Sequence, residues 1–210
     1  DALKAHGSTI EEARADLFGL YYLPDAKMRE LGLTPHDDAY KAEYYSFMMN
    51  GLMTQLVRIE LGNNVEEAHM RNRQLIAKWV FEKGAGDKVV ELVKKEGKTF
   101  VKINDYEKLR DLFGQLLNEI QRIKSEGDYE AARQLVENYA VQVDPELHKE
   151  VLARYQKLNL APYKGFVNPV YTAQKDAEGN IVDVTISYEE GYADQMLRYS
   201  RDYANLPYEN

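Results

Sequence analysis

Residues 7–17 read GSTIEEARADL and open with the start signal of a helix. Ser8 is followed three residues later by Glu11, the spacing of a capping box, in which each side chain satisfies a backbone N–H group of the first turn. We therefore expect a helix that begins near Thr9. Similar start signals, followed by apolar residues at helical spacing, recur along the chain. The predicted fold class is mainly α.

The same stretch predicts an acidic helix face. Glu12 and Asp16 lie four residues apart and share that face, while Glu11 and Arg14, three residues apart, are able to pair beside it. Acids near a helix start suit the positive end of the helix dipole, so one interpretation is purely structural. The other is that these carboxylates form part of a metal site built from several helices. Both interpretations stay open at this point.

Helical patterns dominate the chain up to about residue 160. Further helices are expected at residues 25–31, 37–61, 65–83, 106–124, 129–139 and 144–158. Residues 88–103 alternate in the manner of a short β-hairpin that turns near Gly97. Beyond residue 160 the pattern predicts two strands and a final helix, at residues 166–174, 181–188 and 191–203. We expect a helical domain over residues 1–160 and a short α+β segment over residues 161–210.

The expected helix 37–61 is apolar on more than one side, which indicates burial. It contains the methionines Met48, Met49 and Met53. A methionine cluster is able to form a plastic surface for peptides, but methionine also fills irregular gaps in cores. The core interpretation is the more frequent one.

Composition and charge exclude several classes of partner. The chain has 210 residues, 44% of them hydrophobic, and a net charge of −8 with acids and bases interspersed. This is enough apolar material for a core, and it leaves no basic face to neutralise phosphates, so nucleic acid is not an expected partner. No apolar run has the length of a membrane span, so a membrane is not expected either. The absence of cysteine excludes disulfides and thiolate zinc sites within these residues.

The segment Glu-Glu-Ala-Arg-Ala-Asp at residues 11–16 resembles the Glu-Glu-Cys-Arg-Ala-Glu/Asp motif of the dipeptidyl peptidase III family. Members of that family are zinc peptidases that remove dipeptides from the N-termini of short peptides. The resemblance implies that Glu12 is a zinc ligand and that Glu11 and Asp16 orient two zinc-binding histidines. Ala13 stands where the more familiar motif has cysteine, a side chain that is not a ligand in the family.

A second segment, Glu-Glu-Ala-His-Met-Arg-Asn-Arg at residues 66–73, resembles another motif of the same family. The resemblance implies that His69 donates to the carbonyl oxygen of the substrate and that Arg73 lines the cleft. Such a donor stabilises the oxyanion that forms when water attacks a carbonyl group. Read without the resemblance, a lone histidine on a helix is more often structural.

A third segment, Tyr-Lys-Gly-Phe-Val-Asn-Pro at residues 163–169, aligns loosely with a family segment whose lysine binds the C-terminal carboxylate of the peptide. Lys164 is the matching residue, although a lysine in such a position is often a solvated loop residue. The family has two lobes. The resemblance places residues 1–160 in the mainly helical zinc lobe and residues 161–210 in a return to the second lobe, which is built around a β-barrel.

The family also uses a His-Glu-x-x-x-His helix, which supplies two zinc ligands and the glutamate that activates water. The four histidines of this chain, His6, His36, His69 and His148, do not form that motif. We therefore expect the C-terminal portion of a zinc-dependent dipeptidyl peptidase, whose partners are short peptides and the remainder of the same polypeptide. Alone, these residues are expected to be inactive, to bind zinc weakly at most and to self-associate through exposed apolar cleft surface.

Two alternatives belong to other functional classes. In the first, the chain is a helical scaffold or interaction domain, and Glu12 and Asp16 form a surface stripe. The second is a nucleotide hydrolase, because some relatives carry a fused Nudix module. The Nudix box requires an Arg-Glu pair ahead of its final glutamates, and no such pair precedes Glu11 and Glu12.

Overall fold

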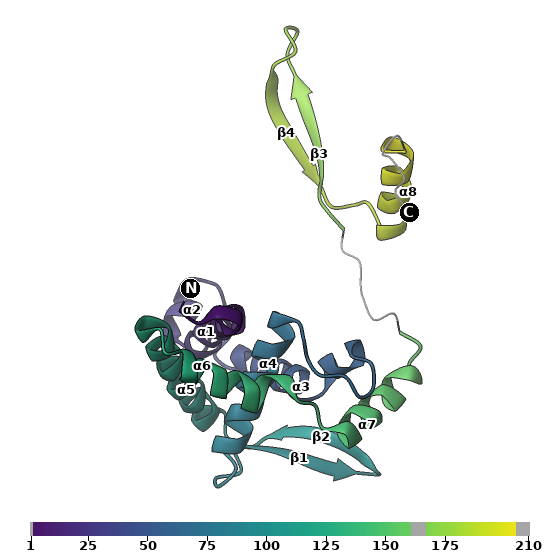
Figure 1. Ribbon diagram of the computed structural model, residues 1–210. Coiled ribbons are helices and arrows are strands. Elements are labelled where there is room, and N and C mark those ends of the chain that lie inside the picture. Colours follow the sequence, from purple (N-terminus) through teal and green to yellow (C-terminus); the bar gives the residue numbers. More distant parts are fainter. Residues whose placement is uncertain (1, 161–166, 205–210) are drawn as a thin grey trace. The chain divides into compact units, whose positions relative to one another are not determined.

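The computed structural model describes residues 2–160 and 167–204 of the chain (Figure 1). The chain divides into two compact units, Asp1–Leu160 and Ala161–Asn210. Within the described residues there are eight α-helices and two antiparallel two-stranded sheets, so the predicted mainly helical class is confirmed. No helix in the described part of the chain is long and apolar enough to cross a membrane.

The first unit contains seven of the α-helices. They are α1 (Gly7–Tyr22), α2 (Ala26–Glu30), α3 (Ala39–Leu52), α4 (Ala68–Lys83), α5 (Tyr106–Glu126), α6 (Tyr129–Val136) and α7 (Pro145–Gln156). Two 3-10 turns, Lys4–His6 and Thr54–Arg58, precede α1 and follow α3, and a π-helical turn, Glu137–Val141, follows α6. The strands β1 (Val90–Lys95) and β2 (Lys98–Ile103) join α4 to α5.

The start of α1 differs from the prediction. The helix begins at Gly7, its N-cap residue is His6, and no side chain caps it, so Ser8 lies inside the helix and the predicted capping box is wrong. The physical reason is the preceding 3-10 turn, which runs directly into α1. Backbone carbonyl groups of that turn accept the first N–H groups, since Gly7 N donates to Lys4 O. A side-chain cap is therefore not needed.

The other predicted helix ends follow their sequence signals more closely. The side chains of Asp105, Asp128 and Asp144 accept backbone N–H groups at the starts of α5, α6 and α7. Gly127 closes α5 in the left-handed conformation, with φ of 64°. The expected helix 37–61 is shorter than predicted, because α3 ends at Leu52 and a 3-10 turn follows.

The core of the first unit lies where α1, α4 and α5 pack together. Side chains from all three helices are fully buried there, among them Ile10, Leu17, Leu75, Ile76, Phe113 and Leu116. Tyr44 of α3 is also buried, and its hydroxyl donates to Leu20 O of α1 at 2.7 Å. That carbonyl belongs to the last turn of α1 and has no acceptor role within the helix. The contact ties α3 to the end of α1.

The predicted hairpin is confirmed. Strands β1 and β2 pair antiparallel, and Lys95 pairs with Lys98 across a two-residue turn. Both turn residues have positive φ, 51° for Glu96 and 73° for Gly97, which is typical of a tight hairpin turn.

The second unit contains β3 (Val170–Lys175), β4 (Ile181–Ser187) and α8 (Tyr192–Asp202). Strands β3 and β4 form an antiparallel pair. Within its described residues only Gln195 is buried, and the apolar side chains of β4 remain open to solvent, with 45% of Val184 and 50% of Ile186 exposed. A lone two-stranded hairpin is marginally stable in water, and residues 167–204 of this unit form no core of their own.

Helices α3 and α4 cross at Gly51 of α3. A Cβ atom at this position would lie 2.5 Å from Arg73 O and 2.6 Å from the Cβ atom of Ala77, both on α4. Only a residue without a side chain fits there. The crossing therefore fixes the position of α4, whose first two turns carry His69 and Arg73.

We predict that Gly51→Ala lowers the free energy of unfolding by about 1–3 kcal/mol, because the added methyl group overpacks the crossing. The matched control is Gly19→Ala in α1, where nothing lies within 4 Å of the added Cβ. That variant should gain about 0.5–1 kcal/mol, since alanine loses less backbone entropy in a helix. Urea unfolding measures both changes. Equal effects of the two substitutions would contradict the close crossing.

Candidate functional site

The two segments singled out by sequence lie side by side, because α1 packs against α4. Ala13 faces the core and is fully buried, so the small side chain permits close packing of α1. The carboxylate face of α1 then borders the first turns of α4. Two polar contacts connect the helices along this border.

The first contact joins Glu12 and His69. Glu12 Oε2 lies 3.2 Å from His69 Nδ1, and the side chains are 34% and 58% exposed. His69 is held at the start of α4, where the Glu67 carboxylate accepts the backbone N–H groups of residues 69 and 70. The pair is therefore accessible from solvent, with the imidazole presented on the first turn of a capped helix.

The second contact joins Asp16 and Asn72. Asn72 Nδ2 donates to Asp16 Oδ2 at 3.0 Å. Asn72 is only 1% exposed, and its side-chain oxygen is buried without a hydrogen-bond partner among the described residues. The sequence pattern did not single out Asn72. Its position one turn beyond His69, facing an aspartate one turn beyond Glu12, is the signal that would have identified it.

Opposing electrostatic effects act on Asp16, and together they leave its pKa above the ordinary value. Burial raises the pKa of its carboxyl group above the ordinary value, and the nearby Glu12 carboxylate adds to the rise. The hydrogen bond from Asn72 and the positive charges of Arg73 and His69 act in the opposite direction. Asp16, Arg73 and the first contact thus belong to one electrostatic cluster.

The Glu11 side chain pairs with residues outside that cluster. Its carboxylate accepts hydrogen bonds from Arg14, at 2.6 Å, and from Lys124 of α5. Glu11 therefore holds α1 against α5, on a separate edge of the helix. The predicted Glu11–Arg14 pair is present. Lys164, the remaining residue singled out by sequence, falls outside the described residues.

The described residues do not form a complete zinc site. Catalytic zinc sites use three protein ligands, commonly histidine and carboxylate. Across residues 2–160 and 167–204, no group of three or more His, Cys, Asp or Glu side chains is arranged to hold a metal ion. Glu12 offers a partly exposed carboxylate of the required kind. Zinc bound there would need further ligands that this arrangement does not provide.

We predict that Asp16→Asn raises the free energy of unfolding at neutral pH. Burial puts the folded-state pKa of Asp16 above its unfolded-state value, so the charged form opposes folding. This penalty is absent below the unfolded-state pKa and is complete once the pH exceeds the folded-state pKa. The gain should therefore appear as pH rises through that window and vanish in acid.

Urea unfolding of both proteins over a pH series measures this difference. The amide oxygen of the variant still accepts the bond from Asn72, so the contact between the helices is kept. A difference in stability that does not change with pH would show that the charge of Asp16 is not destabilising.

A comparison with known protein families bears on this arrangement. The sequence model of peptidase family M49 matches residues 1–196, which include all of the helical unit and most of the remaining chain. This family is the zinc-dependent dipeptidyl peptidase III family. Its peptidase chemistry implies peptide substrates. Since the match extends over nearly the whole chain, the protein belongs to peptidase family M49.

Proposed function

We propose that this chain contributes the glutamate side of the active site of a zinc dipeptidyl peptidase, which removes dipeptides from the N-termini of short peptides. The observation that carries the proposal is the contact between Glu12 and His69, at 3.2 Å. It joins the two motifs that resemble the family most closely, although 56 residues lie between Glu12 and His69 in the sequence. Membership of peptidase family M49 supports the reaction class.

In this proposal Glu12 is the zinc ligand from this chain, and Glu11 and Asp16 are positioning residues. The Glu11 carboxylate, paired with Arg14 and Lys124, fixes α1 against α5. Asp16 holds the border between α1 and α4 through Asn72 and keeps one carboxylate oxygen available to orient an imidazole N–H group. Zinc, when bound, supplies Lewis-acid polarisation of the peptide carbonyl.

His69 and Arg73 are assigned to the substrate. The Glu12 carboxylate lies beside Nδ1, so the Nε2 edge of the ring is the one left to donate to a peptide carbonyl oxygen. Arg73, one turn further along α4, adds positive charge beside the same region. Two further zinc ligands and the general base are not among the motifs of these 210 residues and would be supplied by other residues of the enzyme.

The remaining assignments concern the two units. We assign residues 1–160 to the zinc lobe and residues 161–210 to the second lobe, with Lys164 as the anchor for the C-terminal carboxylate of the peptide. The exposed apolar side chains of β4 support a role in which the second unit packs on other structure. A lysine anchor would favour short peptides, because a longer peptide carries its carboxylate past the charge.

We predict that Glu12→Ala in the complete enzyme abolishes both zinc retention and dipeptide release, because a site of three protein ligands loses its carboxylate. Zinc is measured by atomic absorption after dialysis, and release is measured with a dipeptidyl arylamide. Glu66→Ala, an exposed acid just ahead of α4, is the matched control and should change neither quantity. If the Glu12 variant keeps its zinc, the helical scaffold or another ligand set replaces this proposal.

We predict a different outcome for His69→Asn. Loss of the donor should lower kcat by about 10²–10³-fold, the scale of an oxyanion-hole donor, while zinc content stays at one ion per enzyme. The measurement pairs steady-state kinetics with metal analysis on the same preparation. A variant that loses zinc together with activity would reassign His69 from the substrate to the metal site.

A further inference from the structure

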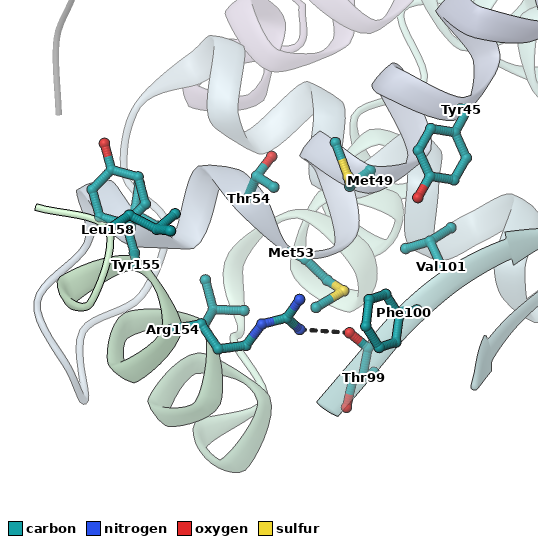
Figure 2. A pocket seen from close by; sticks show the side chains of 12 residues that line it. Tyr45, Met49, Met53, Thr54, Thr99, Phe100, Val101, Arg154, Tyr155 and Leu158 are labelled. Carbon is teal, nitrogen blue, oxygen red and sulfur yellow. Dashed lines mark hydrogen bonds between the residues drawn. The ribbon is translucent and has the colours of Figure 1, made fainter. Parts of the chain in front are cut away.

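A pocket of about 290 Å³ lies in the first unit, and none of the residues assigned to catalysis lines it (Figure 2). Its walls come from α3, the following 3-10 turn, β2 and α7, and they are almost wholly apolar. Met49 and Met53 line it, whereas Met48 is buried in the core. Met48 and Met53 belong to the core and Met49 packs against it, so the cluster has the expected core role, and two of its members also line the pocket. Flexible methionines suit a pocket that adapts to its ligand.

One side of this pocket is formed by consecutive residues of strand β2, from Thr99 to Val101. Lys95 and Lys98 flank a two-residue turn, so they form a hydrogen-bonded pair. Hydrogen-bonded and non-hydrogen-bonded pairs alternate along an antiparallel ladder, so Thr99 and Val101 belong to non-hydrogen-bonded pairs. The backbone groups of Thr99 and Val101 consequently point away from β1. The pocket lies beside an edge of the sheet.

That edge is closed at Thr99. Its N–H group donates to Glu150 Oε1 at 2.7 Å. Its carbonyl oxygen accepts from Arg154 Nη1 at 2.6 Å (Figure 2). Both partners are side chains of α7. They occupy the hydrogen-bonding positions that a neighbouring strand would otherwise fill.

The edge is unpaired two residues further on, at Val101. No backbone or side-chain hydrogen bond to the outward N–H or C=O group of Val101 is found among the described residues. Val101 is only 5% exposed, and it lines the pocket. Backbone polar groups in such a position are ordinarily paired. The combination of an unpaired strand edge and an apolar pocket is the arrangement that binds an extended peptide by strand addition.

We propose that this pocket binds an extended segment of another polypeptide, which pairs with β2 at Val101 and places an apolar side chain between Met49, Met53 and Tyr45. The residue opposite Val101 supplies that side chain, because Val101 itself faces the core side of the hairpin. Its two neighbours in the peptide face the opposite side. The proposal is independent of the zinc site, since it uses none of its residues.

The charge of the hairpin specifies one of those neighbours. The chain carries a net charge of −8, but residues 90–103 contain four lysines and two glutamates. Lys98 and Lys102 lie on the solvent side of β2, on either side of Phe100, which is 38% exposed. A peptide residue opposite Lys102 is favourably acidic. The expected ligand therefore has an apolar residue next to an acidic one.

The test uses the full 210-residue chain, labelled with ¹⁵N, and a short blocked peptide with a central Glu-Leu pair among serine and threonine residues. We expect saturable shifts in the NMR spectrum at Val101 and the pocket, and slower hydrogen exchange of the Val101 amide. The Thr99 amide, already bonded to Glu150, should keep its exchange rate. Binding without protection of Val101, or no binding at all, would overturn the proposal.

Two controls separate strand addition from non-specific adhesion. N-methylation of the peptide leucine removes its donor without altering the protein and should weaken binding about tenfold, as expected for the loss of a backbone hydrogen bond. Tyr45→Ala should weaken binding, whereas Tyr22→Ala, at a similarly exposed tyrosine outside the pocket, should not. Equal binding of the methylated peptide would contradict strand addition. Sedimentation showing that a second copy of the chain occupies the pocket would contradict the choice of ligand.

Discussion

The packing of α1 between α4 and α5 is the constraint on which the rest of the molecule depends. On one side Glu11 is paired with Lys124 of α5, and on the other Asp16 is paired with Asn72 of α4. Fully buried apolar side chains fill the space between these polar edges. With α1 fixed on both sides, Glu12 has one place to lie, and that place is beside His69.

This arrangement has an energetic cost at the border of α1 and α4. Burial opposes the charged form of Asp16, and a single hydrogen bond from a buried amide partly offsets that opposition. The other atom of the amide, Asn72 Oδ1, is itself buried without a partner among the described residues. Incompletely satisfied polar groups are disfavoured in an ordinary core and are often retained where a ligand completes them. Two such groups, Asp16 and Asn72, lie at the border of α1 and α4.

Much of this could be predicted from sequence, and the exceptions have physical causes. The caps at Asp105 and Asp144 act locally and were predictable, as was the hairpin turn at Gly97. The capping box at Ser8 was a wrong prediction because the turn before it already supplies carbonyl acceptors. Local spacing does not reveal what the preceding residues do.

The residues of the candidate site also fall into those that the sequence identified and those that it did not. Motif resemblance singled out Glu12 and His69, and the structure brings these two together. It gave no indication of Asn72 or Lys124, because their partners lie 56 and 113 residues away in the sequence. The open edge at Val101 was equally hidden, since it depends on which backbone groups α7 covers. Contacts between residues so far apart in the sequence follow from tertiary packing, and the hydrophobic periodicity of the sequence does not reveal them.

The most direct test of the central claim is a zinc-edge anomalous crystal structure of the complete enzyme. If α1 presents Glu12 to the metal, a carboxylate oxygen of Glu12 will lie about 2.0–2.2 Å from the zinc ion. His69 will then stand beside the site without coordinating it. A zinc ion bound elsewhere, with Glu12 still paired only to His69, would contradict the account.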